Sequence, residues 1–374
     1  MDDTREPVLL SEVVGETEAA LTRRGFMASI PVAALGAAAC AQEPAQESAP
    51  GAAADTSAPL RRGAINSDSR LDTALVDPDR RHEGSATAAV RAAQAAPFQP
   101  YDARLPPLSP ERRLAVHWRA IEQPVRILPD LAVAGWTFEG DIPGPVLHVR
   151  QGDVIDFTLT NAGDVPHSMD FHAAQIDPKT AFRSVPKGES VSFTFEAKHA
   201  GAFMYHCGTA PVLMHIGTGM YGAIIVDPPE PLPSAKEFVL VQSEYYLGET
   251  QDELAEFDYR KMAGTLPDYV VFNGRPDQYV AEPLRVEVGD RVRFYVVSAG
   301  PTHPCSFHVV GDLFDAVYLA SPPANPLRGV QTFAVPAGGG MVFDLIADVA
   351  GEFPFVNHGF GHGQKGAIGF LNVE

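Results

Sequence analysis

The 374-residue chain is short of cysteine and of positive charge, and both shortages narrow what the protein can be. Three cysteines, at positions 40, 207 and 305, are too few for a disulfide framework. Only 28 Lys and Arg residues stand against 47 Asp and Glu, which excludes a general nucleic-acid binder because phosphate contacts need surplus cationic side chains. No apolar run reaches the roughly 20 residues of a transmembrane helix. Hydrophobic residues still make up 45% of the chain, so whole-chain disorder is excluded and the length predicts two domains.

The first forty residues resemble an export signal. Arg23 and Arg24 precede a short apolar run over residues 28–39, a pattern typical of the twin-arginine route and therefore of a periplasmic protein. Cys40 follows three alanines, and the sequence leaves open whether it is a lipid attachment site or lies beside a cleavage site. Residues 41–110 are interpreted as a spacer and N-terminal extension, because their first part is rich in Ala, Pro, Gln, Glu and Ser.

The rest of the chain repeats itself. Residues 149–163 match residues 286–300 without a gap, and shorter matches follow in the same order. These later pairs are Phe171-His172 with Phe307-His308, Val185–Phe193 with Val335–Phe343, Ala200–Phe203 with Ala350–Phe353, and Gly222–Ile224 with Gly366–Ile368. Agreement at five places in one order indicates an internal duplication.

Both copies are predicted to be all-β. Apolar, β-branched and aromatic residues dominate segments such as 154–160, 190–195, 291–297 and 341–347, and Gly-Asp, Pro-x-Gly and Asp-Pro breaks separate them. A proline-rich junction at residues 227–233 divides the copies. The sequence therefore predicts two tandem β-sandwich domains over residues 111–232 and 233–374.

The first copy carries a set of copper-type ligands. Cys207, His215 and Met220 follow one another after a predicted strand, and His167 lies on an earlier segment. One thiolate, two imidazoles and a weak thioether form the ligand set of an electron-transfer copper site. Asn357 replaces the cysteine in the second copy, which should therefore hold no such site, and Cys305 is expected to be a core residue.

These motifs resemble the copper-containing nitrite reductases over residues 110–374, and the resemblance implies two cupredoxin-like Greek-key domains. It implies that the residues of the His-x-x-Asp-x-His segment serve two coppers, with His167 on the type 1 electron-transfer copper and His172 on the type 2 catalytic copper. His206 would bind the type 2 copper, while its neighbour Cys207 binds the type 1 copper. Each subunit would then hold one copper of each type.

The resemblance also implies a homotrimer, in which the second domain of a neighbouring subunit supplies the third type 2 ligand. His358 matches that position, and His362 is its rival. Asp170 and His308 match the pair that delivers protons, since reduction of nitrite to nitric oxide consumes one electron and two protons.

Other functions remain open alternatives. A laccase-like two-domain multicopper oxidase would need several His-x-His pairs, and the chain contains none. A copper electron carrier would not need His172, His206 and His358 together with a proton-delivering pair. The preferred hypothesis is a periplasmic nitrite reductase of denitrification or detoxification, whose electrons come from a small donor protein, either a cupredoxin or a c-type cytochrome.

Overall fold

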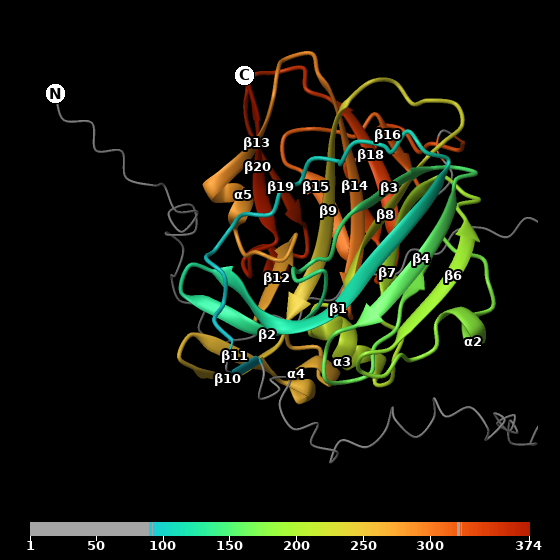
Figure 1. The fold of residues 1–374 in the computed structure, drawn as a ribbon. Coiled ribbons are helices and arrows are strands. Elements are labelled where there is room, and N and C mark those ends of the chain that lie inside the picture. Colours follow the sequence, from blue (N-terminus) through green and yellow to red (C-terminus); the bar gives the residue numbers. More distant parts are fainter. Residues whose placement is uncertain (1–89, 92, 320–321, 323) are drawn as a thin grey trace, which may run out of the picture. The chain divides into compact units, whose positions relative to one another are not determined.

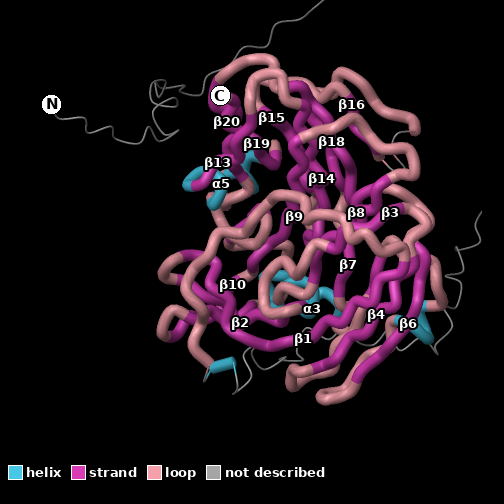
Figure 2. Tube along the Cα trace, turned by 45° about the horizontal axis from the view of Figure 1, so that its top comes forward, coloured by secondary structure: helices cyan, strands magenta, loops and turns pink. Residues whose placement is uncertain are grey.

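The structure is a computed structural model that describes residues 90–91, 93–319, 322 and 324–374. The predicted signal segment, Cys40 and most of the range 41–110 lie outside the described residues. Strands dominate the described part, and its helices are short (Figures 1 and 2). Among the described residues, no helix is both long enough and apolar enough to cross a membrane.

The first β-sandwich packs a six-stranded sheet against a four-stranded sheet. The six-stranded sheet has the order β10-β11-β2-β1-β4-β6, and the four-stranded sheet has the order β3-β8-β7-β5. Phe157 of β4 meets Phe171 of β5 with ring centroids 5.0 Å apart, so the core lies between the two sheets. The strands are β1 (Arg113–Leu128), β2 (Leu131–Phe138), β3 (Leu147–Arg150), β4 (Val154–Asn161), β5 (Asp170–Phe171), β6 (Ser190–Glu196), β7 (Gly201–His206), β8 (Tyr221–Asp227), β10 (Leu247–Gln251) and β11 (Leu254–Phe257).

The second β-sandwich packs two five-stranded sheets together. Their orders are β12-β9-β14-β18-β16 and β13-β20-β19-β15-β17. Phe294 of β14 meets Phe307 of β15 at 5.3 Å, and Cys305 is buried in this core as expected. The strands are β9 (Lys236–Tyr245), β12 (Tyr269–Phe272), β13 (Glu282–Val286), β14 (Arg291–Gly300), β15 (Cys305–Val309), β16 (Ala316–Tyr318), β17 (Thr332–Val335), β18 (Gly340–Ile346), β19 (Gly351–Asn357) and β20 (Ile368–Val373).

Strand register repeats between the two sandwiches. Phe157 pairs with Phe193 in the first sandwich, and Phe294 pairs with Phe343 in the second, as the sequence duplication requires. In both copies the first strand of the sheet in sequence, β1 or β9, runs parallel to its neighbour, β4 or β14. The prediction of two tandem β-sandwiches is therefore confirmed.

Two segments connect the sandwiches in ways that the sequence did not reveal. The β10–β11 hairpin lies within the range 233–374, yet it extends the sheet of the first sandwich through pairing of Leu254 with Ala132. Part of the N-terminal extension pairs with β9, since the Val239 amide donates to Ala103 O at 2.7 Å. The short helices are α2 (Pro178–Ala181), α3 (Val212–Gly217), α4 (Tyr259–Ala263), α5 (Gln278–Ala281) and α6 (Phe360–Gly363).

The second sandwich contains a buried ion pair whose loss should be costly. Arg293 and Asp344 face each other on β14 and β18, with Nε 2.7 Å from Oδ1 and with both side chains almost fully buried. We expect Asp344→Ala to reduce the free energy of unfolding by about 3–5 kcal/mol, because it leaves a buried guanidinium without its main partner. Denaturant titration followed by circular dichroism measures this loss.

The control is Asp156→Ala, which breaks the exposed pair of Arg113 and Asp156 on the first sandwich. Water screens that pair, so its loss should change the unfolding midpoint little. Equal midpoint shifts for the two variants would contradict the importance assigned to the buried pair.

Candidate metal centres

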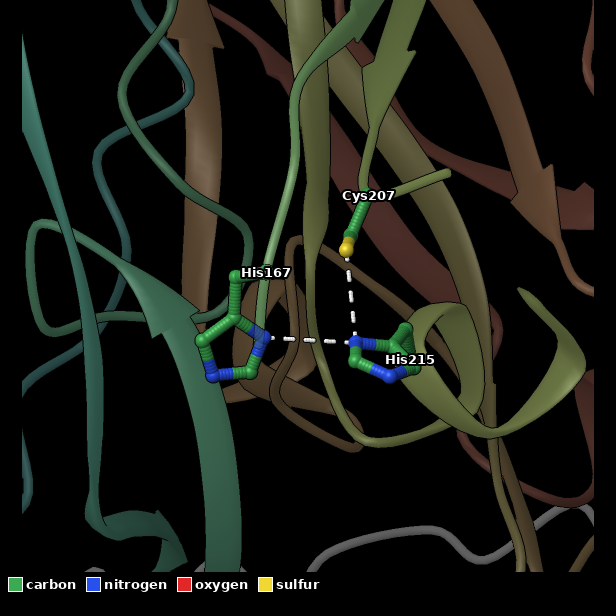
Figure 3. A group of neighbouring side chains, drawn as sticks. All are labelled: His167, Cys207 and His215. Atoms are coloured by element: carbon green, nitrogen blue, oxygen red, sulfur yellow. Dashed lines mark hydrogen bonds between the residues drawn. The ribbon is translucent and has the colours of Figure 1, made fainter. Parts of the chain in front are cut away.

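A buried group of three ligand-type side chains lies at one end of the first sandwich. His167 precedes β5, Cys207 directly follows β7, and His215 sits on α3. Figure 3 shows the three side chains pointing toward one another. His215 Nδ1 lies 3.3 Å from Cys207 Sγ and 3.3 Å from His167 Nδ1. All three residues are at most 3% exposed, so water has little access to the space between them.

Neighbouring groups hold these three side chains in place. The Ser168 amide donates to Cys207 Sγ at 3.3 Å, and the Gly208 amide donates to Ser168 Oγ at 2.9 Å. The Trp136 ring packs edge-on against both imidazoles, with its centroid 4.7 Å from that of His215. The geometry is therefore set by the backbone and by packing as well as by the ligands themselves.

The sulfur of Cys207 is suited to bind a metal as a thiolate. Burial alone would raise the pKa of this thiol, but the imidazoles of His215 and His167 and their hydrogen bonds hold the pKa well below its ordinary value. A thiolate is the form of cysteine that binds metals. Cys305 contrasts with it, because burial raises the pKa of that thiol and no imidazole offsets the effect.

Met220, the fourth residue predicted for this group, is fully buried. Its backbone is tied to two other members, since the Cys207 amide donates to Met220 O and the Met220 amide donates to His215 O, both at 3.1 Å. These bonds hold Met220 next to Cys207 and His215. A role for its sulfur as axial ligand stays a prediction.

A second group lies nearer the surface and contains Asp170, His172 and His206. The Nε2 atoms of His172 and His206 are 3.0 Å apart, and Asp170 Oδ2 lies 3.9 Å from His206 Nε2. Partial burial and the nearby His206 lower the pKa of His172, which favours the neutral imidazole that binds metals.

Hydrogen bonds at the far side of each ring aim free nitrogens into the groups. His206 Nδ1 donates to Cys207 O at 2.9 Å, and His172 Nδ1 donates to Gly338 O at 2.9 Å, because carbonyl oxygens can only accept. The two facing Nε2 atoms therefore carry lone pairs. Two lone pairs at this separation repel unless a cation or a proton lies between them, so the donor set fits a metal ion.

Adjacent residues connect the two groups. His206 is the last residue of β7, and Cys207 follows it directly. Successive side chains of a strand point to opposite faces, so one side chain enters the buried group and its neighbour enters the outer group. A thiolate with two imidazoles matches electron-transfer copper, and the outer imidazole pair suits a second copper with open positions.

Comparison with known proteins agrees with this copper chemistry. A family model described as multicopper oxidase matches residues 120–231. The copper-containing nitrite reductase of Neisseria gonorrhoeae is 38% identical over 271 residues, which cover 70% of this chain and 69% of that protein. The chain belongs to the copper-containing nitrite reductases.

Solved structures give the same assignment. A copper nitrite reductase from Nitrosomonas europaea superposes on the present chain with a TM-score of 0.66 at 38% identity. The match covers 70% of the present chain and 94% of the other. A copper-containing nitrite reductase from Thermus scotoductus has a TM-score of 0.64 at 31% identity, and the match covers 70% of the present chain and 62% of the other. A multicopper oxidase follows at 28% identity with a TM-score of 0.62.

The second sandwich of this nitrite reductase keeps its predicted site residues apart from those of the first. Within the described ranges, neither metal-type group includes a histidine from the second half. His308 and His358 lie together instead, with ring centroids 5.3 Å apart, and His358 is exposed. His362 is half-buried, its ring packs 4.7 Å from that of His303, and its Nδ1 lies 3.1 Å from Asn357 Nδ2.

Three contacts around the two groups were missed by the sequence analysis. They are the Glu122 carboxylate beside His167, the Ser168 amide on the sulfur, and Gly338 O on His172. All three join residues that lie at least 39 positions apart in the sequence. β1 also contains Arg113, His117, Arg119, Gln123 and Arg126, so a carboxylate at position 122 gave no distinct signal in the sequence.

Cys207→Ala tests the assignment of the buried group. Without the thiolate, we expect the copper-loaded protein to lose its intense visible absorption and to bind one copper fewer per chain, since thiolate-to-copper charge transfer produces that colour. Absorption spectroscopy and metal counting measure both effects.

The matched control is Cys305→Ala, which removes the other buried thiol of the described residues. Its spectrum and copper content should equal those of the unmodified protein. If the colour persisted without Cys207, or disappeared without Cys305, the assignment would be wrong.

Proposed function

We propose that this protein reduces nitrite to nitric oxide, with electrons entering at the buried group and nitrite reduced at the outer group. The observation that carries the proposal is the direct succession of His206 and Cys207, which places a ligand of each group on neighbouring residues. Copper bound at the two groups would supply one-electron transfer, which neither imidazole nor carboxylate can perform.

The two groups divide the reaction between them. Conversion of nitrite to nitric oxide takes up one electron and two protons, breaks one N–O bond and releases water. His167, Cys207 and His215 would hold the electron-entry ion, with Met220 as a weak fourth ligand. The covalent link from Cys207 to His206 would then offer a short path for an electron to the outer group.

Asp170 and His308 deliver the protons. Asp170 is part of the outer group, and its partly exposed carboxylate can exchange protons with water. His308 Nδ1 donates to Gln331 O at 2.6 Å, so its Nε2 is the nitrogen that is left to hold and release a proton. Because His308 lies on the second sandwich, it must reach the outer group together with His358.

A neighbouring subunit supplies the second sandwich that completes each outer group. His358 is exposed and stands beside His308, whereas the ring of His362 already contacts Asn357 and His303. This difference favours His358 as the third ligand of the outer group. The proposed assembly is the homotrimer of the family, in which each outer site is shared between two chains and each chain holds one copper of each type.

The supply of electrons and the location follow from the same proposal. A small cupredoxin or a c-type cytochrome would donate electrons at the buried group. Arg23-Arg24 and the following apolar run favour twin-arginine export to the periplasm, with lipid attachment at Cys40 as one outcome. A laccase-like oxidase is disfavoured, because the chain has no His-x-His pair for a three-copper cluster.

His172→Ala separates the two groups by experiment. The variant should keep the intense visible absorption, because the buried group is intact, and should lose nitrite turnover, because the outer group has lost a ligand. His199→Ala is the control, since this histidine of the same sandwich is exposed and, among the described residues, only Gln175 lies within hydrogen-bonding distance of its ring, at 3.2 Å. Full nitrite turnover without His172 would rule out the outer group as the reaction site.

Mixing two inactive variants tests the shared site. His172→Ala and His358→Ala each damage every outer site when expressed alone. Co-expressed at equal levels, they should restore about one quarter of the sites, because some interfaces then join an intact first sandwich to an intact second sandwich. Nitrite turnover of the purified mixture measures the recovery, and its complete absence would show that no site is built between chains.

A further inference from the structure

Glu122 is a buried carboxylate in the middle of β1. Its side chain is only 2% exposed, and on the neighbouring strand it pairs with Trp136, the residue whose ring covers the buried metal group. A carboxylate is costly to bury without hydrogen bonds, so its contacts show what it does there.

One carboxylate oxygen of Glu122 receives three hydrogen bonds. Oε1 lies 3.2 Å from His167 Nε2 and accepts from the amides of Asp164 and Val165 at 2.7 and 2.8 Å. Because the carboxylate accepts, His167 donates from Nε2 and keeps its Nδ1 lone pair directed at the metal group. Gly163 makes room for this arrangement, since a Cβ there would lie 2.6 Å from Oε1.

The second carboxylate oxygen has no such partner. Glu122 Oε2 is buried, and within the described residues it has no hydrogen-bond partner. The negative charge is therefore only partly balanced, and it acts in surroundings that screen charge poorly. The His167 ring that it contacts is a ligand of the proposed electron-entry copper.

We propose that Glu122 is a positioning residue of the electron-entry centre, which fixes the orientation of His167 and holds the reduction potential of the bound copper down. This inference rests on the proposed function. A carboxylate that accepts from the outer nitrogen of a ligand imidazole makes the ring a stronger electron donor. The oxidised ion has the higher charge, so a nearby negative charge stabilises it over the reduced ion.

The duplication supplies an internal comparison. β1 and β9 pair with equivalent positions of the repeat. Ala120 of β1 pairs with Asn161, and Gln242 of β9 pairs with Ser298. Asn161 and Ser298 occupy matching positions in the two copies. Glu122 and Glu244 each lie two residues further along their strands, so they occupy equivalent positions.

Glu244 makes the loop contacts of Glu122 without the ring contact. It accepts from the amides of Thr302 and His303 at 3.2 and 2.6 Å, and the Tyr246 hydroxyl also donates to it. The His303 ring turns elsewhere, with Nε2 3.2 Å from Thr265 O. Both glutamates therefore bind backbone amides of the loop that follows β4 or β14. Of the two, only Glu122 also contacts the ring of a predicted metal ligand.

Glu122→Gln and Glu244→Gln form the matched pair that tests the inference. Both keep the side-chain shape and remove one charge, so their effects on folding should be similar. With the copper-loaded proteins, redox titration of the visible absorption should show a higher midpoint potential for Glu122→Gln and an unchanged one for Glu244→Gln. Glu122→Asp retains the charge and should stay closer to the unmodified protein.

An unchanged potential in Glu122→Gln, or equal shifts in both glutamine variants, would overturn the inference and leave the proposed function intact. An unmodified protein without type 1 absorption would contradict the proposed function itself. Should Glu122→Gln fail to fold, pulsed electron paramagnetic resonance on the unmodified protein decides the question. It should detect two inequivalent outer imidazole nitrogens at the type 1 copper, and equivalent ones would overturn the inference.

Discussion

The alternation of side chains at the end of β7 is the constraint on which the rest of the site depends. Because His206 and Cys207 are neighbours on an extended chain, they cannot point into the same space. Cys207 reaches the buried end of the first sandwich, and His206 reaches the outer group nearer the surface. Each metal-type group thus has its own surroundings, while only one peptide link separates them.

The surroundings prepare each imidazole for a metal ion before any ion arrives. In the buried group, Glu122 orients His167 so that Nδ1 faces the sulfur, whereas in the outer group carbonyl oxygens orient His206 and His172 so that Nε2 is free. The same chemical device thus selects opposite ring nitrogens in the two groups. Such outer contacts set ligand orientation and basicity, and are a normal part of metal sites.

The fold could be predicted from the sequence because each strand pattern occurs twice, once in each copy of the repeat. Residues 154–160 and 291–297 matched each other as well as the strand pattern, and β4 and β14 lie where they were expected. The buried group could be predicted because three of its members fall within fourteen residues, Cys207 to Met220. The resemblance to a known family then supplied His172 and Asp170.

Contacts between distant segments could not be predicted in this way. The β10–β11 hairpin joins the other sandwich through strand pairing, which sequence pattern does not specify. Gly338 O meets His172 only because the two sandwiches pack together. Every residue has a backbone carbonyl, so the sequence does not indicate which one accepts this hydrogen bond. The parallel pairing of β1 with β4 brings the segment after β4 beside Glu122, so the contact of Glu122 with His167 became visible only with the sheet in place.

Electron paramagnetic resonance with copper counting on the unmodified, copper-loaded protein tests the two-centre arrangement most directly. We expect two signals of equal weight, one with the narrow hyperfine splitting of a thiolate-bound copper and one with the wide splitting of an imidazole-bound copper. A single signal of the thiolate-bound kind, with one copper per chain, would contradict the arrangement and indicate an electron carrier.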